Sequence, residues 1–434
     1  MRDLLMLLLL AGGCIWALRA PWIGAMLWTA ISLGSPHVEF AHNAGDWPVA
    51  SVVAISTLIG LLRTQDRHNP IVGAPSAWLL AFVVWITITL PFSFYFEYSY
   101  PLWERSMKIF LMLFVTMALI DSRQKIDVFV WVMVCALGYY GVKGGLFTLA
   151  TGGNYRVWGP GGFVEGNNEL ALAMLMTLPL ARYLQLQSSS RWVRWGLTAS
   201  MLLMVVMVLG THSRGALVGL AAMGFVFWLK SPGKMLSGLA IVGIVFVALP
   251  FMPEHWWARM ETIKAYEQDG SALGRINAWW NAWNVAKAHL FGGGFIIYTP
   301  EVFAIYSPEP ERVHAAHSIY FQVLGEHGFI GLAIFLAIGV STWIGCRRLI
   351  RIGAGDPDLR WAKDLGAMIQ VSMIGYASAG AFLSLAYFDL PYNLMAVTVL
   401  AHYVIARRAP AGTPAVPAAS AVPAKPRLPP LPAR

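Results

Sequence analysis

Long apolar segments recur along almost the whole chain, separated by short polar stretches. Ala77–Leu90, Leu197–Leu209 and Gly331–Ile344 are examples, and each approaches the roughly 20 residues that a helix needs to cross a bilayer. The pattern predicts twelve crossings, at 3–34, 47–62, 76–93, 103–120, 126–149, 168–182, 193–210, 215–229, 234–250, 318–346, 365–388 and 391–406. Pro21 lies inside the first of them, so two short helices, giving thirteen crossings or a hairpin, are the alternative.

The composition agrees with this pattern. Hydrophobic residues make up 57% of the 434 residues and charged residues only 12%, which is about half the charged share of a soluble domain. We therefore expect an all-α, polytopic integral membrane protein with about 12 transmembrane helices. The apolar N-terminus is interpreted as an uncleaved first segment, because Trp22–Leu33 is apolar again. The three dispersed cysteines indicate neither a disulfide framework nor a metal site.

The distribution of lysine and arginine orients the expected helices. The loops 63–75, 121–125, 182–194, 230–234 and 347–364 hold 14 such residues, whereas the short loops on the other side hold 4. Because cytoplasmic loops are enriched in positive charge, the first set and both termini are expected in the cytoplasm. The net charge of +9 is spread over these loops, so it indicates membrane topology and no nucleic-acid partner.

The chain divides into three predicted parts. Residues 1–409 form the transmembrane helical domain, and within it 251–317 form one large loop on the non-cytoplasmic side. In that loop Leu273–Leu290 reads as an amphipathic helix whose tryptophans either anchor it in the membrane interface or stack on sugars. Residues 410–434 are rich in proline and alanine, which predicts a disordered cytoplasmic tail.

Polar residues gather where three predicted helices begin on the non-cytoplasmic side. Arg214 starts one crossing, Asn168 and Glu169 start another, and His314 and His317 end the large loop. Helix N-termini attract anions, so this surface is a candidate phosphate site. The alternatives are an arginine that snorkels, a glutamate that caps its helix, and a solvated histidine pair on one helical face.

The large loop adds two further arginines. Arg275 is a candidate for anion binding, or it pairs with Glu267 or Asp269, and Arg259 is a weaker candidate. A zinc site at the two histidines needs a third ligand, and Glu326 lies about two and a half turns further along, so no metal is expected.

Two other motifs have structural interpretations. Glu326 and His327 fall inside a predicted membrane helix, either as a packing pair or as functional groups. Gly292-Gly293-Gly294 has no following lysine, so it predicts a tight turn where the loop doubles back rather than a phosphate-binding loop. No nucleotide-binding signature is evident, and no cofactor is expected.

These residues resemble a known family. Ser213-Arg214-Gly215, Gly274-Arg275, and His317 followed by Tyr320-Phe321 and Leu324–Gly328 are similar to the O-antigen ligase/polymerase superfamily over about 197–346. The stretch Tyr139–Tyr155, with Arg156–Gly159 and Gly166–Glu169, resembles the O-glycosylation ligase branch. The family often has Asn directly after the histidine, whereas this chain has Ser318.

The resemblance implies a GT-C-like fold and a metal-independent, inverting transfer of a glycan from undecaprenyl diphosphate to a sugar hydroxyl of lipid A-core. It implies a multi-pass protein of the bacterial inner membrane whose active site faces the periplasm and lies among membrane lipids. Arg214 and Arg275 are then expected to stabilise the leaving diphosphate, and His317 to accept or orient the acceptor proton. The further substrate contacts expected are His314, Asn168, Glu169 and Arg259.

Three other functions remain open at this point. A polymerase of O-antigen or exopolysaccharide and a protein O-oligosaccharyltransferase share the donor and differ in the acceptor, which the sequence does not identify. A transporter of the lipid-linked glycan predicts ionisable residues at mid-membrane and paired broken helices. The charges here cluster at one face and no internal repeat is evident in the sequence, which argues against the transporter.

Overall fold

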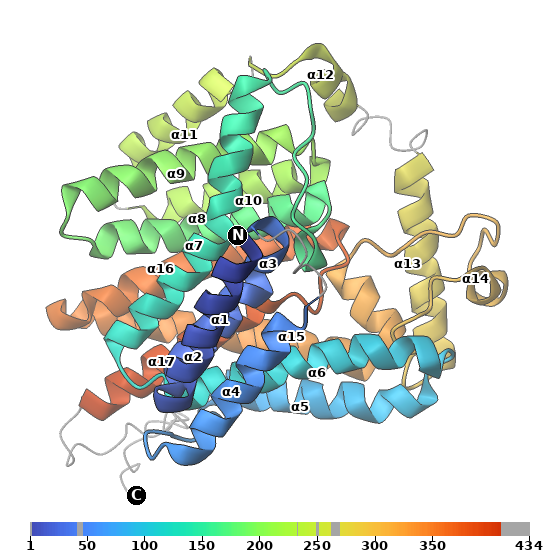
Figure 1. Ribbon diagram of the computed structural model, residues 1–434. Coiled ribbons are helices and arrows are strands. Elements are labelled where there is room, and N and C mark those ends of the chain that lie inside the picture. The colour runs from blue at the N-terminus through green and yellow to red at the C-terminus, as the bar shows by residue number, and fades with distance from the viewer. Residues whose placement is uncertain (1, 41–46, 232, 249–250, 262–269, 409–434) are drawn as a thin grey trace, which may run out of the picture.

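A computed structural model describes residues 2–40, 47–231, 233–248, 251–261 and 270–408 (Figure 1). Helices joined by loops make up these ranges, and no strand occurs within them, which confirms the all-α class. In the described part, five helical segments are long and apolar enough to cross a membrane: Ala74–Phe92, Arg123–Ala150, Arg191–Gly210, Ile319–Gly355 and Pro357–Phe382. The predicted tail, 410–434, lies outside the described residues.

The described helices are named here in chain order. They are α1 (Arg2–Arg19), α2 (Pro21–Gly34), α3 (Pro36–Phe40), α4 (Val49–Arg63), α5 (Ala74–Thr89), η1 (Leu90–Phe92), α6 (Phe96–Leu119), α7 (Arg123–Ala150), η2 (Gly162–Val164), α8 (Asn167–Gln187), α9 (Arg191–Gly210), α10 (Arg214–Lys230), α11 (Lys234–Ala248), α12 (Glu254–Glu261), α13 (Gly270–Ala288), α14 (Pro300–Tyr306), α15 (Ile319–Gly355), η4 (Pro357–Leu359), α16 (Arg360–Ala379), η5 (Gly380–Phe382) and α17 (Asp389–Arg408).

The helices of the bundle run between two ends. At the end called here the loop end, α13 runs across the ends of α5 and α6 (Figure 1). The helix α8 starts at this end and is the most deeply buried element, with Leu170–Leu175 at most 1% exposed. It packs against α7, α9, α10 and α16, so its first turn is held from several sides.

The first predicted crossing is wrong in one respect. Residues 3–34 form two helices, because Pro21 has no amide hydrogen to continue α1 and instead starts α2. The two helices pack against each other as a hairpin, and the N-terminus lies beside α3 (Figure 1). Ser35, which follows α2, lies near Gly162 in the loop that leads to α8. The N-terminus therefore lies at the loop end, opposite to the side that the sequence predicted.

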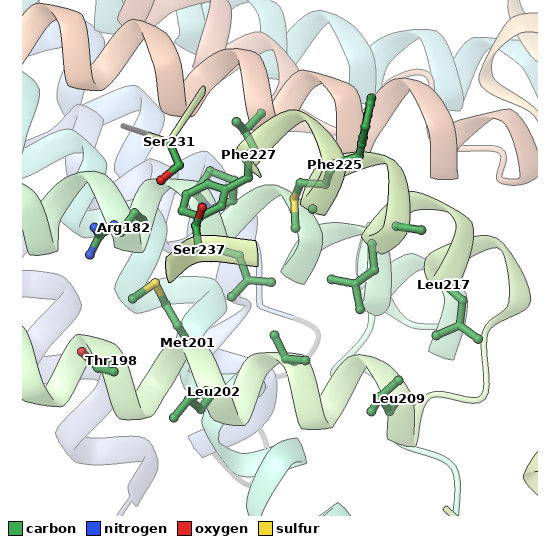
Figure 2. Close-up of a pocket in the computed structure, with 18 of the residues that line it drawn as sticks. Arg182, Thr198, Met201, Leu202, Leu209, Leu217, Phe225, Phe227, Ser231 and Ser237 are labelled. Carbon is green, nitrogen blue, oxygen red and sulfur yellow. The ribbon is translucent and has the colours of Figure 1, made fainter. Parts of the chain in front are cut away.

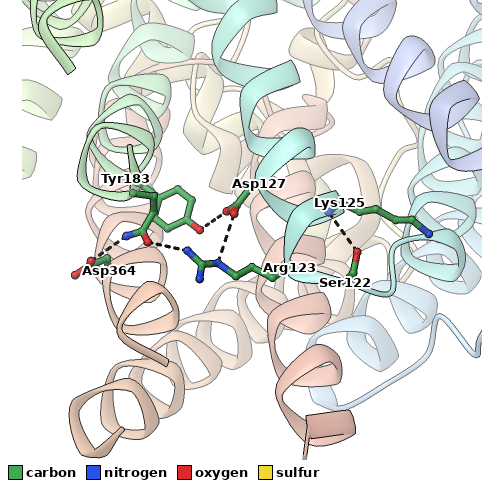
Figure 3. Close-up of polar contacts among 7 residues, drawn as sticks. Ser122, Arg123, Lys125, Asp127, Tyr183 and Asp364 are labelled. Atoms are coloured by element: carbon green, nitrogen blue, oxygen red, sulfur yellow. Dashed lines mark hydrogen bonds and ion pairs between the residues drawn. The ribbon is translucent and has the colours of Figure 1, made fainter. Parts of the chain in front are cut away.

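A polar network holds the far end of the bundle together (Figure 3). The Tyr183 hydroxyl donates to the Asp127 carboxylate, which also pairs with Arg123 at 3.5 Å. Arg123 donates to the Gln187 side chain at 3.1 Å, and Gln187 donates to Asp364 at 3.0 Å. These contacts join the start of α7, the end of α8 and the start of α16.

The helix predicted in the large loop is present as α13. Its buried residues are mostly small or polar, among them Gly274, Ala278 and Ala282, and this helix packs against α15. Its Trp280 and Trp283 are 52% and 40% exposed, whereas Trp279 stacks on Phe321 of α15, so the tryptophans do not all face outward. Trp256 of α12 is buried, and its indole donates to the Leu209 carbonyl at 3.0 Å.

The large loop is fastened to α15 at a kink. Gly328 has a φ of +71°, a conformation that favours glycine, and the Leu290 carbonyl occupies the space that a Cβ would need. The amides of Gly293 and Gly294 donate to the carbonyls of Gly325 at 2.9 Å and Glu326 at 3.0 Å. The tight turn predicted at 292–294 is thus confirmed, and it supplies donors to a membrane helix.

Candidate functional site

The site is built from the starts of helices at the loop end, beginning with α10. Arg214 is the first residue of α10, and the Ser213 hydroxyl caps the helix by accepting from the Ala216 amide at 3.3 Å. The preceding Thr211 and His212 are buried, and His212 has a φ of +55°. This fixed turn places Arg214, which is half-buried, at the edge of the bundle.

The start of α8 is tied to the same turn. The Asn167 side-chain amide donates to the Thr211 carbonyl at 2.7 Å. Glu169 folds back over Gly166 and its carboxylate accepts from its own backbone amide, as a helix-capping group does. The charge of Arg275 also acts on this carboxylate. Glu169 therefore caps its helix and faces the candidate site at the same time.

The two histidines precede α15 rather than lying on it. Residues 312–318 are not helical, so the predicted shared helical face is wrong, and His317 adopts a left-handed backbone with a φ of +42°. The loop still brings the two rings together, with their centroids 5.1 Å apart. Ser318 occupies the cap position of α15, and its side chain makes no capping hydrogen bond.

Arg275 lies beside these histidines on α13. Its neighbour Gly274 packs on the His314 ring, where a Cβ would be 2.8 Å from Cδ2. Burial first, then the charges of Arg275 and His314, lower the pKa of His317 to about 4. The His317 Nδ1 is buried without a hydrogen-bond partner. At neutral pH the imidazole is therefore uncharged and able to accept a proton.

The short helix η5 contacts both α10 and α15, so that the helix starts form a ring. A Cβ on Gly215 of α10 would lie 3.2 Å from the Phe382 side chain, and one on Gly380 would lie 2.9 Å from Ile319 at the start of α15. The starts of α8, α10 and α15 are thus linked to one another, and α13 joins them through Arg275. Four residues that are far apart in the sequence gather at one end: Arg214, Glu169, Arg275 and His317.

The remaining predicted contacts are placed less fully. Asn168 is half-buried in the first turn of α8, next to Glu169. Arg259 belongs to α12, and its side chain is outside the part of the chain that the structure describes. Glu267 and Asp269, the alternative partners of Arg275, also lie outside the described residues.

Sequence reasoning missed one arginine near the site. The Arg105 guanidinium of α6 lies 3.8 Å from the ring centre of Phe163, just before α8, and its charge interacts with Asp389. The Ser32 hydroxyl donates to the same carboxylate. Arg105 could have been noticed in the sequence, because the short loops expected on the non-cytoplasmic side hold only 4 lysines and arginines.

Glu326 does not serve as a third ligand to a zinc site at His314 and His317, because its carboxylate lies in another network. Tyr387 donates its hydroxyl to the Glu326 carboxylate and also contacts His327 Nε2 at 2.7 Å, while His327 Nδ1 contacts Thr89 at 2.8 Å. Within the described ranges, no three His, Cys, Asp or Glu side chains gather as metal ligands would. Glu326 and His327 are thus part of a buried network behind the site.

A large cavity lies between α8, α9, α10, α11 and α12 (Figure 2). Its volume is about 920 Å³, and its lining includes none of the predicted site residues. Leu209 and Leu217 of its lining flank the turn before Arg214. The cavity is therefore adjacent to the ring of helix starts but separate from it.

Comparison with known families covers both halves of this site. Residues 199–336 match the family model described as O-Antigen ligase, and this stretch holds Arg214, Arg275 and His317. Residues 1–189, which include Glu169, match a family of unknown function (DUF5935). No curated protein matches the chain. The match over 199–336 confirms the resemblance noted over 197–346. Residues 199–336 are thus similar to the O-antigen ligase family, whose members are glycosyltransferase-like enzymes that act on polyprenyl-linked glycans.

Proposed function

We propose that the chain is an O-antigen ligase of the bacterial inner membrane. It transfers a glycan from undecaprenyl diphosphate to a sugar hydroxyl of lipid A-core on the periplasmic side, without a metal ion. The observation that carries the proposal is the position of Arg275, whose charge acts on both Glu169 and His317. A permanent cation therefore lies close enough to interact with both a carboxylate and an imidazole near the start of α15.

The arginines suit the donor. A diphosphate is multiply charged, and arginine binds phosphate oxygens through two parallel hydrogen bonds while staying charged at any working pH. Arg214 adds the N-terminal end of α10, whose free amides also favour an anion. When the bond between the sugar and the diphosphate breaks, charge grows on the leaving oxygen, and both arginines stabilise it.

His317 suits the acceptor. The acceptor oxygen attacks the anomeric carbon from the face opposite the diphosphate, the sugar–oxygen bond to the diphosphate breaks, and the hydroxyl proton passes to the imidazole. The configuration at the anomeric carbon is inverted. Arg275 contributes to the low pKa of His317. A bound diphosphate offsets that positive charge, so donor binding raises the pKa and makes the imidazole a stronger base.

The test uses the purified protein with undecaprenyl-diphosphate glycan and lipid A-core, followed on a gel. A slower lipopolysaccharide band is expected with the wild type. Arg275→Ala and His317→Ala should each lower its rate of formation by about 100-fold or more, the usual cost of removing a group that stabilises the transition state. Arg312→Ala is the control, since this arginine of the same loop pairs with Glu309 at 3.2 Å.

Other outcomes decide between the alternatives. Longer lipid-linked chains in place of the lipopolysaccharide band would identify a polymerase. A folded protein that consumes no donor with this acceptor points to a protein acceptor or to transport. Chelator should leave the rate unchanged, and a loss restored by zinc or magnesium would refute the metal-independent mechanism.

A further inference from the structure

The apolar and the polar residues that line the cavity between α8 and α11 lie at opposite ends of it. Near the loop end its walls are apolar, formed by Leu209 of α9, Leu217 of α10, and Trp256 and Trp257 of α12. The polar side chains of the lining belong to the far end: Arg182, Gln185, Thr198, Ser231 and Ser237. Figure 2 shows Arg182 and the two serines on one side of the cavity, away from Leu209 and Leu217.

Positive charge lies at the polar end. Arg182 lines the cavity and donates to Gln185, and Arg194 is near enough for the two charges to interact. Asp364 is the acidic group whose charge reaches Arg182. Two guanidinium groups thus stand against this carboxylate, so the polar end favours an anion.

The cavity also reaches the apolar outer surface of the bundle. Its lining residues Leu202, Phe225 and Leu236 are 47%, 59% and 75% exposed. The helix α11 packs on α10, whereas α9 packs on α7 and α8, and the cavity occupies the space among them. A ligand can therefore enter sideways from the hydrocarbon of the membrane.

We propose that this cavity binds an anionic phospholipid. Its acyl chain lies along the apolar walls toward α12, and its phosphate is bound by Arg182 at the far end. Basic pockets between membrane helices are a general means of binding anionic head groups. A polyprenyl diphosphate held at Arg214 would place its charge at the loop end instead, where the lining is apolar. The proposal does not depend on the transfer reaction.

The test is a titration of the purified, detergent-solubilised protein with phosphatidylglycerol, with bound lipid counted by native mass spectrometry. Phosphatidylcholine with the same acyl chains is the comparison. Phosphatidylglycerol should bind more tightly, and Arg182→Gln should weaken it about tenfold, as expected for one charged hydrogen bond. Arg351→Gln, at an exposed arginine of α15, should leave the affinity unchanged.

A second pair of variants tests the location. Gly224 lines the cavity, and a Cβ there would meet no atom within 4 Å, so Gly224→Phe fills the space without a backbone clash. It should abolish phosphatidylglycerol binding, whereas Gly196→Phe, equally unobstructed but outside the lining, should not. Equal binding of both phospholipids, or tighter binding of undecaprenyl phosphate that Arg182→Gln does not alter, would overturn the proposal.

Discussion

At the residue scale, the uncharged state of His317 links the stability of the fold to pH. Its pKa is about 4 in the folded protein and near 6.5 when unfolded, so the unfolded chain binds the proton more readily. The contribution of neutral His317 to the free energy of unfolding is therefore fully present above about pH 6.5 and is lost as the pH drops toward 4. His317→Gln should reduce this fall, measured as thermal unfolding temperatures at pH 7.5, 5.5 and 4.5. An identical pH dependence in wild type and variant would contradict the assigned burial.

The charge of Arg275 gives a second prediction at this scale. Removing it in Arg275→Gln should raise the pKa of His317, because a nearby cation disfavours the imidazolium ion. The pKa can be followed by NMR of labelled histidine across a pH titration. Arg312→Gln serves as the control within the same loop. A pKa that stays low in Arg275→Gln would mean that burial and the His314 charge set it without Arg275.

Single residues also show how far the sequence was informative. The polar residues at the helix starts could be identified from the sequence, because few charged groups occur in such an apolar chain. The left-handed backbone of His317 was not readable, since non-glycine residues rarely adopt a positive φ. That conformation accompanies contacts with α13, such as the Trp279 indole donating to the Ala316 carbonyl at 2.7 Å.

At the element scale, the kink in α15 carries the third prediction. Gly328→Ala should destabilise the protein by at least about 1–2 kcal/mol, because alanine disfavours the left-handed conformation and its methyl group overlaps the Leu290 carbonyl. Gly339→Ala, on the same helix with open space around it, should be neutral or slightly stabilising. The midpoints of thermal unfolding in detergent compare the two. Equal midpoints would show that the kink is not required.

The elements differ in how well periodicity predicted them. The position of α13 was predictable because its small and tryptophan positions alternate at helical spacing. The start of α15 was also correct, whereas its end at Gly355 lies beyond the predicted residue 346. The kink was not predictable, because it depends on a glycine turn about 35 residues earlier that only the folded chain brings near.

At the scale of the whole molecule, the fourth prediction concerns topology. The charge distribution of the loops predicts that the loop end lies in the periplasm and the far end in the cytoplasm. An impermeant maleimide should therefore label Pro308→Cys in cells with an opened outer membrane. It should label Gly355→Cys only after lysis; both positions are exposed. Cells carrying the unmodified chain give the background from its own cysteines. The reverse pattern would invert the assigned orientation.

The gathering of the site is also a property of the whole molecule. Arg214, Glu169, Arg275 and His317 come from four different helix starts or loops, and their spacing along the chain does not predict their distance. The hairpin of α1 and α2 likewise depends on Pro21 together with the close packing of Gly24 against Ala17 and Thr57. Sequence reasoning listed the groups, and the packing of the bundle determined which of them meet.

The fastening of the large loop to α15 has a consequence for biogenesis. The carbonyls of Gly325, Glu326 and His327 accept hydrogen bonds from Gly293, Gly294 and the Trp85 indole, and two of these donors belong to the large loop, which in the proposed orientation must first leave the cytoplasm. Until the loop arrives, these carbonyls of α15 would be unpaired in the membrane, at a cost of several kcal/mol. In the proposed orientation, export of the loop and maturation of the membrane helix are therefore coupled, and the proposed catalytic groups assemble only after the loop is translocated.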